Sequence, residues 1–298
     1  MISICIPVYN FDIGDLVRKL SEQSKLLEVP SEIILIDDCS ENIFRKQNDT
    51  GFEDIVYIQL EQNIGRAAIR NLFLKYSKYE YLLFLDCDSI VFSADFLSNY
   101  INAIVKHPNS IICGGREYEK NPPRRDKMLR WKYGIKKESK SFETRSRSPN
   151  TSFMTNNFVI SREIFTTIQF DERLVNYGHE DTLFGFELKE NSIEIDHIDN
   201  PILNGHLESN SEYLTNTEKA IENLTSILRY TGNSEALIND ITLLRIFYRL
   251  YKVRRIILLM FVILKPLVKY TLTRGYVHLW LFDFYKLGTL IGKLNHKD

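Results

Sequence analysis

The sequence predicts an α/β protein with a mostly parallel sheet flanked by helices, followed by an α-helical C-terminal extension. Short apolar runs recur through the first 160 residues, segments with helical apolar spacing separate them, and the chain becomes strongly basic from residue 241. Strands that alternate with helices are typical of a parallel sheet with right-handed crossovers. We therefore expect one domain over 1–209 and a helical extension over 210–298.

The composition is that of an ordinary globular protein. A chain of 298 residues, with 44% hydrophobic and 26% charged residues, can bury a full core and carry an appendage. The four cysteines lie within or just after predicted strands at no metal-binding spacing, which indicates reduced thiols and a cytoplasmic location; they are Cys5, Cys39, Cys87 and Cys113. A strand begins at Ile2, so no signal peptide is expected.

The elements follow in order along the chain. Strands are predicted at 2–8, 32–36, 55–60, 81–85, 110–114 and 155–160. Asp12 can cap a first helix, further helices are expected after Arg66 and over 93–106, and Ser161 can cap a short one. Residues 116–149 hold twelve Lys and Arg together with Pro122 and Pro123, which predicts a long basic loop over 116–152, either functional or simply solvated.

The strand at 81–85 has five apolar residues without a break and stops at Asp86-Cys87-Asp88. Such a run indicates a strand buried on both faces. Residues two apart share a face, so both carboxylates can reach one cation at the edge of the sheet where ligands bind. Carboxylate oxygens suit Mg²⁺ or Mn²⁺, which can hold a diphosphate. An Asp-x-Asp pair is also common in solvated loops, so the rest of the chain must decide.

Polar residues also follow the first two strands. Tyr9-Asn10 closes the first and Asp37-Asp38 the second. Turn formation explains each pair alone, but explains less well why acids close two long apolar strands. No Gly-x-Gly-x-x-Gly or Gly-Lys-Ser/Thr motif is present, which argues against a dinucleotide dehydrogenase and a P-loop NTPase.

Two later segments carry further candidate residues. Glu180 and Asp181 stand where a helix should begin, after a Tyr-Gly loop. Acids favour a helix N-terminus through the macrodipole, but a carboxylate held there could also act as a general base. His206 follows an apolar segment at 201–204, and a lone histidine of this kind is more often structural than a ligand.

With these motifs in order, residues 1–207 resemble the family 2 glycosyltransferases and their GT-A fold. The resemblance rests on Pro7-Val8-Tyr9-Asn10, Asp37-Asp38-Cys39-Ser40, Asn63-Ile64-Gly65-Arg66 with Arg70-Asn71, Asp86-Cys87-Asp88, and Phe170-Asp171-Glu172-Arg173 through Glu180-Asp181. The last segment also looks like the C-terminal acceptor-side motif of β-galactosyltransferases. Each motif is weak alone, but their common order is a strong signal.

The resemblance implies a role for each candidate. The residues expected at the nucleotide are Pro7, Tyr9, Asn10, Asp37, Asn63, Arg66, Asp86, Cys87 and Asp88. Asp86 and Asp88 look like the metal motif, with Asp86 nearer the ribose and Asp88 on the cation, and His206 resembles the histidine that completes the metal site in many members. Asp181 resembles the catalytic base, with Glu180 beside it to contact the acceptor.

The implied reaction is an inverting, metal-dependent transfer of one sugar from a nucleotide-sugar donor. The expected donors are UDP-linked Gal, GalNAc, Glc or GlcNAc, with Mn²⁺ or Mg²⁺, and the acceptor is a saccharide or lipid-linked saccharide. No Gln-x-x-Arg-Trp follows Asp181, which favours single transfer over polymer synthesis. The alternatives are a nucleotidyltransferase, against which the absence of a Gly-rich basic loop after the first strand argues, and a non-catalytic membrane-associated scaffold.

The C-terminal segment differs in charge from the rest. Residues 241–298 contain eleven Lys and Arg against two Asp, a net +9 that leaves −10 for 1–240. Helices are predicted over 211–229 and 234–264, and the longest apolar run, 256–264, is short of the roughly twenty residues that a membrane span needs and should end at Lys265-Pro266. Basic and aromatic residues on amphipathic helices favour peripheral contact with the inner face of a membrane. A cap on the catalytic domain or a homodimer contact would explain them too, and no nucleic-acid module accompanies the charge.

Overall fold

The computed structural model describes residues 1–49, 55–174, 177–232 and 234–295, and this part of the chain forms two compact units. Unit 1 comprises Met1–Tyr118, Ser139–Val175 and Glu180–His206, and unit 2 comprises Glu119–Glu138, Asn176–His179 and Leu207–Asp298. The chain passes finally into unit 2 after His206, near the predicted boundary, but unit 2 also takes two earlier segments that were expected in the first domain.

Within the described residues of unit 1, seven strands form a mixed sheet in the order β3-β2-β1-β4-β8-β6-β9. They are β1 Ile2–Val8, β2 Ser31–Asp37, β3 Ile55–Gln59, β4 Tyr81–Leu85, β6 Ile111–Cys113, β8 Asn157–Ser161 and β9 Ile195–His197. Neighbours are parallel except that β8 runs antiparallel to both β4 and β6. The predicted α/β fold with a mostly parallel sheet is confirmed.

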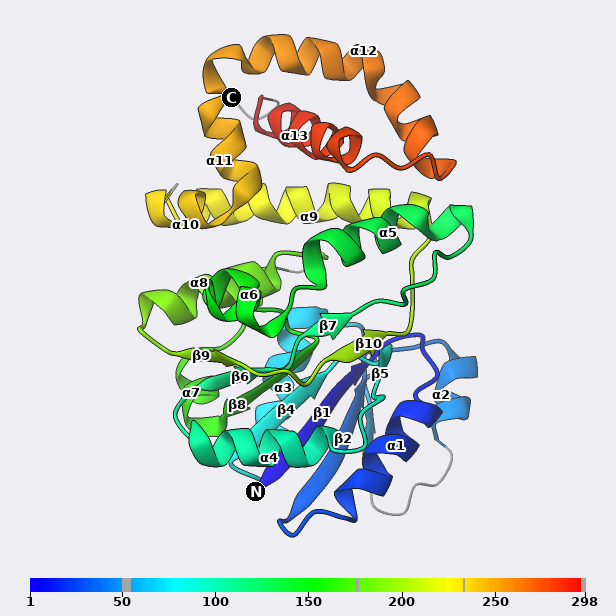
Figure 1. The fold of residues 1–298 in the computed structure, drawn as a ribbon, viewed down its shortest axis with the longest axis vertical. Coiled ribbons are helices and arrows are strands. Elements are labelled where there is room, and N and C mark those ends of the chain that lie inside the picture. The colour runs from blue at the N-terminus through cyan, green and yellow to red at the C-terminus, as the bar shows by residue number, and fades with distance from the viewer. Residues whose placement is uncertain (50–54, 175–176, 233, 296–298) are drawn as a thin grey trace. The chain divides into compact units, whose positions relative to one another are not determined.

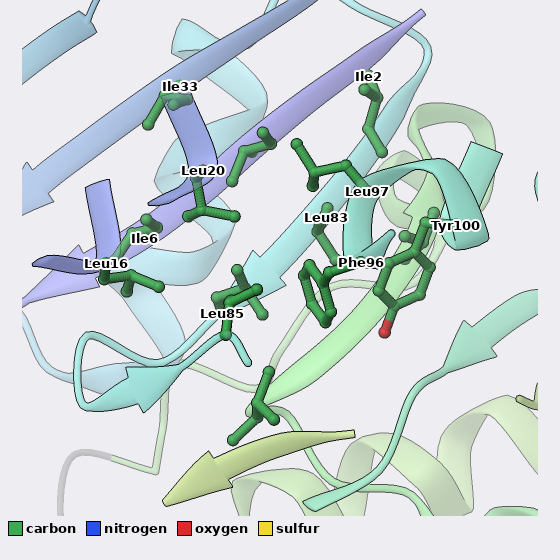
Figure 2. Packing of buried hydrophobic residues seen from close by; sticks show 14 of the residues in the cluster. Ile2, Ile6, Leu16, Leu20, Ile33, Leu83, Leu85, Phe96, Leu97 and Tyr100 are labelled. Carbon is green, nitrogen blue, oxygen red and sulfur yellow. The ribbon is translucent and has the colours of Figure 1, made fainter. Parts of the chain in front are cut away.

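Helices cover both faces of this sheet (Figure 1). They are α1 Gly14–Ser24, α2 Asn42–Asn48, α3 Arg66–Tyr76, α4 Phe96–Lys106, α7 Arg162–Thr167 and α8 Glu180–Glu190. Alternate residues of β4 serve the two faces: Leu83 packs with α1 and α4, whereas Phe84 packs with α3 and α7. Figure 2 shows the first of these cores, where Leu16 and Leu20 of α1 and Phe96 of α4 lie over the sheet.

A second, smaller sheet places two candidate segments side by side. Its order is β5-β10-β7, with β5 at Ser89–Ile90, β7 at Arg116–Glu117 and β10 at Ile202–Asn204. Asn204 pairs antiparallel with Ser89, so the residue after β10 and the residue before β5 meet. The chain reaches Asp88 and His206 from opposite directions at this point.

The prediction of a long basic loop over 116–152 is wrong, because this segment is largely helical. It contains a 3₁₀ helix at Arg125–Lys127, α5 Met128–Tyr133, a π-helix at Gly134–Glu138, α6 Phe142–Ser146 and a 3₁₀ helix at Asn150–Ser152. Most of its basic residues are exposed or half-buried, but two are buried and paired: in unit 2 the Arg130 guanidinium lies 2.9 Å from a Glu138 carboxylate oxygen. In unit 1, buried Arg145 donates to the backbone oxygens of Cys113, Gly114 and Ile198.

Unit 2 is a helical assembly around one apolar cluster. Its later elements are α9 Asn210–Tyr230, α10 Glu235–Asp240, α11 Thr242–Arg249, a 3₁₀ helix at Tyr251–Val253, α12 Arg254–Thr273 and α13 Leu279–Asn295. Ser209 and Glu212 form a capping box at the start of α9, which satisfies two backbone N–H groups. Leu129 of α5 is buried in the same cluster as Phe282 and Tyr285 of α13, which explains why residues 119–138 belong to this unit.

The predicted end of the apolar helix at Lys265-Pro266 is also wrong. Helix α12 continues through Pro266 to Thr273, and Figure 1 shows it bending along its course. A proline inside a helix removes one backbone hydrogen bond and bends it, but here the packed turns on both sides keep it continuous. In the part of the chain that the structure describes, Tyr251–Thr273 is long and apolar enough to cross a membrane, by length and composition alone.

Candidate active site

The predicted site residues gather in unit 1, around the loops after β1, β2 and β4, the start of α8 and the residues after β10. The loops after β1, β2 and β4 follow the carboxyl ends of parallel strands, where ligands bind in open α/β sheets. The side chains of the site form three groups. The first lies on the loops after β1 and β2, the second comprises the Asp86–Asp88 segment and His206, and the third is the Glu180–Asp181 pair.

Asp86 is held by two arginines. Arg70 of α3 donates to Oδ1 at 2.9 Å and Arg116 of β7 donates to Oδ2 at 3.3 Å. Burial works to raise the pKa of Asp86, but the two guanidinium groups outweigh it and the pKa is lowered, so the carboxylate stays ionised. Asp86 therefore already forms ion pairs with two arginines, which the expectation of a metal ligand did not include.

Asp88 has a different environment. The backbone N–H of Gly205 donates to the Asp88 backbone oxygen at 2.8 Å, and a side chain at position 205 would collide with this oxygen. The Asp88 carboxylate accepts no hydrogen bond from the described residues, although His206 acts on it electrostatically. Burial and then the charge of Asp86 raise the pKa of Asp88, and together they outweigh the opposing charges of Arg116 and Arg66.

The side chains available for a cation are therefore Asp88 and His206. Among the described residues, no three His, Cys, Asp or Glu side chains are arranged to hold a metal by themselves. A carboxylate oxygen and an imidazole nitrogen fit Mn²⁺ or Mg²⁺ if a diphosphate and water complete the coordination. Asp86 keeps lone pairs that could also reach a cation, but its charge is already paired with Arg70 and Arg116.

Arg66 connects the acidic residues after β4 with those at the start of α8. Its guanidinium lies 3.5 Å from Glu180 Oε1 and also acts electrostatically on Asp86 and Asp88. The Arg66 side chain is 52% exposed, whereas that of Glu180 is only 6% exposed. Glu180 Oε2 is buried without a hydrogen-bond partner among the described residues, a cost that a bound hydroxyl group would remove.

The environment of Asp181 makes its carboxylate a stronger base than a free aspartate. Burial, followed by the charge of Glu180, raises the pKa of Asp181 to about 6, although hydrogen bonds from Thr182 oppose the rise. Both bonds, from the Thr182 backbone N–H at 2.7 Å and its hydroxyl at 3.2 Å, go to Oδ1. The described residues supply no hydrogen bond to Oδ2, so this oxygen is available to a substrate.

Hydrogen bonds join the loop after β1 to the loop after β2. Asp37 is completely buried, and its carboxylate accepts hydrogen bonds from the Ser40 backbone N–H at 2.7 Å and the Tyr57 hydroxyl at 3.1 Å. The Asn10 backbone N–H donates to Ser40 Oγ at 2.8 Å. Asp37 and Asn10 therefore shape these loops through internal hydrogen bonds, and the structure does not present Asp37 as an open ligand for ribose.

Tyr9 is the exposed member of this group. Its side chain is 53% exposed, and Pro7 is half-buried at the end of β1. Burial and the charge of Asp88 raise the pKa of Cys87 to about 12, so the thiol stays protonated. Asn63 donates to the Asp38 backbone oxygen at 3.0 Å.

Three residues that shape the site received no role from the sequence. Asp38 accepts from the backbone N–H groups of Ile64 at 2.7 Å and Gly65 at 3.1 Å, and so fixes the loop that carries Arg66. Arg70 stands one helical turn after Arg66, a spacing that could have suggested a shared face. Arg116 gives no local signal, since it lies thirty residues from Asp86 in sequence.

The family model for glycosyl transferase family 2 matches residues 3–168. An uncharacterized glycosyltransferase from Haemophilus influenzae is 32% identical over 111 residues, which cover 37% of this chain and 36% of the relative. The match thus spans little more than a third of the length of that curated relative.

Solved structures share the fold at low sequence identity. A mannosyltransferase from Pyrobaculum calidifontis, solved with GDP-Man and Mn²⁺, has a TM-score of 0.59 at 14% identity, covering 100% of this chain and 88% of that one. S. aureus TarS 1–349 with UDP-GlcNAc has a TM-score of 0.53 at 16% identity, covering 100% and 92%. These similarities show the GT-A fold, and with a family model that matches more than half of the sequence they establish that the chain belongs to glycosyl transferase family 2.

Proposed function

We propose that this chain is a metal-dependent, inverting glycosyltransferase that moves one sugar from a UDP-linked donor to a saccharide or lipid-linked saccharide. The donor would carry Gal, GalNAc, Glc or GlcNAc. The observation that carries the proposal is the position of Arg66, whose guanidinium reaches Glu180 and acts on both Asp86 and Asp88. It brings the residues expected at the donor and those expected at the acceptor into one cluster.

The donor would lie along the carboxyl edge of the sheet. Tyr9 offers an exposed aromatic face for the base, and Arg66 offers positive charge to the diphosphate. Asp88 and His206 would hold Mn²⁺ or Mg²⁺ against the diphosphate, where a divalent cation neutralises the charge of the leaving group. Asp86 would hold Arg70 and Arg116 in place beside this group rather than bind the cation itself.

The transfer would be a single displacement. The acceptor hydroxyl oxygen forms a bond to the anomeric carbon while the bond from that carbon to the diphosphate oxygen breaks, and UDP leaves with the electron pair. Asp181 Oδ2 accepts the hydroxyl proton, and Glu180 accepts a hydrogen bond from a second acceptor hydroxyl. Attack from the face opposite the leaving group inverts the configuration. Positioning supplies much of the rate, because a carboxylate is a modest base.

A nucleotide-sugar screen tests this proposal. In the presence of Mn²⁺, a UDP-sugar should raise the Tm of the protein, and addition of acceptor should release UDP. Binding of the nucleotide favours the folded state by mass action, so the shift should grow with ligand concentration. Release of pyrophosphate would instead identify a nucleotidyltransferase. If no nucleotide sugar changed the Tm, the remaining interpretation would be a non-catalytic scaffold.

The pH dependence of the reaction follows from Asp181. Its pKa is raised to about 6, so the base is protonated below that pH and ionised above it. We expect kcat/KM to fall about tenfold per pH unit on the acid side of pH 6 and to level off above it. Since Asp181 and Glu180 interact, this acid limb belongs to the pair.

The measurement is kcat/KM for the identified donor across the acid and neutral range, with circular dichroism at each pH to confirm that the protein remains folded. Glu180→Gln provides a matched comparison: it removes the neighbouring negative charge, so the limb should move to lower pH. A profile that stays flat well below pH 6 would mean that Asp181 is not the group that accepts the proton.

A further inference from the structure

Helix α12 exposes a continuous apolar face in unit 2. Six side chains at helical spacing are each between 50% and 68% exposed: Ile256, Leu259, Met260, Ile263, Leu267 and Tyr270. Isolated exposed apolar residues are ordinary, but a contiguous row along one helix marks an interaction surface. We call this row the α12 face.

The opposite side of α12 is already occupied. Phe261, Val268 and Leu272 are buried in the apolar cluster of unit 2. The Phe261 and Tyr285 ring centroids lie 5.7 Å apart, and any side chain at Gly288 of α13 would overlap Phe261. The helix is therefore apolar on both sides, and the α12 face is the side that this unit leaves uncovered.

Basic and aromatic residues surround the α12 face. The exposed basic residues near it in the sequence are Arg245, Arg249 and Lys252 before α12, Arg255 and Lys269 within α12, and Arg274 after it. Exposed aromatic residues accompany them, with Tyr251 before the helix and Tyr276 and Trp280 after it. An apolar surface ringed by cations and amphipathic aromatic rings matches the interface of a bilayer that contains anionic lipid.

The contacts of α12 favour an orientation in the plane of the membrane. The Lys265 ammonium lies 3.4 Å from Glu218 of α9, and the inner side of the helix packs on α13 along its length. A membrane span would have to break these contacts and place Lys265 and Lys269 in hydrocarbon, which is costly. If α12 lies in the plane of the membrane interface, its contacts with α9 and α13 remain intact and only the α12 face enters the membrane.

We propose that the α12 face is a docking surface for an anionic phospholipid bilayer, with α12 lying in the plane of one leaflet. The basic residues supply attraction to the lipid headgroups, and the apolar row supplies burial among the acyl chains. The surface belongs to unit 2, whereas the donor-site residues belong to unit 1, so the two proposals can fail independently.

The test is co-flotation of the full chain with vesicles of phosphatidylcholine alone or mixed with phosphatidylglycerol. We expect flotation only with the mixed vesicles, weakened by high salt. The variant Leu259→Ser/Ile263→Ser/Leu267→Ser should lose binding by about a hundredfold, because three apolar side chains no longer enter the membrane. The matched control is Leu26→Ser/Ile43→Ser/Val105→Ser, which removes three exposed apolar side chains of unit 1 and should float like the parent protein.

Three outcomes would overturn the proposal. Equal flotation of the triple variant and the parent would exclude the α12 face. A parent protein that sediments as a dimer without lipid and a triple variant that sediments as a monomer would show that a second copy covers the face. Resistance of the bound protein to extraction at alkaline pH would indicate a spanning helix. An unchanged Tm and an unchanged circular dichroism spectrum confirm that each variant is folded.

Discussion

Asp181→Asn is expected to lower kcat by roughly a hundredfold to ten-thousandfold, because an amide cannot take the proton from the acceptor hydroxyl. Asparagine keeps the shape of the side chain and an oxygen that can accept the two hydrogen bonds from Thr182. The donor site should therefore be unaffected, and the half-saturating concentration of the UDP-sugar should stay the same. Turnover is followed as UDP release, and donor binding as the shift in Tm.

The stability of the variant gives an independent check. The pKa of Asp181 is raised in the folded protein, so its ionised form is favoured in the unfolded chain. At neutral pH, removal of this charge should leave the free energy of unfolding equal or higher. A loss of activity with no loss of stability would separate a catalytic defect from a folding defect.

The matched control is Glu187→Gln, which makes the same chemical change later on α8. Burial and the charge of Asp171 raise the pKa of Glu187 to about 7, but it has no contact with the residues of the candidate site in the described structure. This control should keep parental turnover. Full turnover in Asp181→Asn would mean that another group takes the proton, and loss of donor binding would mean that Asp181 shapes the donor site.

The sheet could be predicted from sequence because its signal is local. Residues 81–85 are apolar without interruption and every one of them is buried, as expected for a strand covered on both faces. Because Asp86 and Asp88 directly follow this strand, they must lie at its carboxyl end. The position of Asp86 and Asp88 follows from backbone geometry, which explains why the amino-acid pattern alone could locate the site.

The partners of these carboxylates could not be predicted in the same way. Arg70 reaches Asp86 across sixteen residues and Arg116 across thirty, so both contacts depend on how elements pack. The same motif predicted two metal ligands, but packing makes its two acids unequal: Asp86 accepts hydrogen bonds from two arginines and its pKa is lowered, whereas the pKa of Asp88 is raised. A spacing shows which side chains share a face, but it does not show which charges will neutralise them.

The errors at 116–152 and at Pro266 have a common cause. In both segments a polar or helix-breaking residue was treated as a sign of local structure, whereas the packing around it allows a helix to form. Arg130 is buried because Glu138 and Glu208 accompany it, and Lys265 sits within a packed helix because Glu218 is nearby. Burial of a charge depends on its partner, and the partner is not visible in a local window.

Asp88→Asn is expected to remove the dependence of donor binding on Mn²⁺. The Asp88 carboxylate accepts no hydrogen bond from the described residues, and His206 lies close enough to act on it electrostatically. Loss of an outer partner of a metal site typically costs about ten- to hundredfold in metal affinity, so loss of a direct ligand should cost about a hundredfold or more. The measurement is the Mn²⁺ concentration that gives half of the UDP-dependent rise in Tm.

Asp86→Asn makes the comparison decisive, because it changes the other acid of the same motif. It should keep the Mn²⁺ dependence but lower the free energy of unfolding by roughly 3 kcal/mol, since the buried Arg70 guanidinium loses its charged partner. Asp95→Asn, an exposed position seven residues after Asp88, should change neither quantity.

If Asp86→Asn abolished the Mn²⁺ dependence, both acids would be metal ligands, and donor binding would have to displace the arginines from Asp86. If Asp88→Asn left it intact, the cation would lie elsewhere and the assignment of Asp88 and His206 would be wrong.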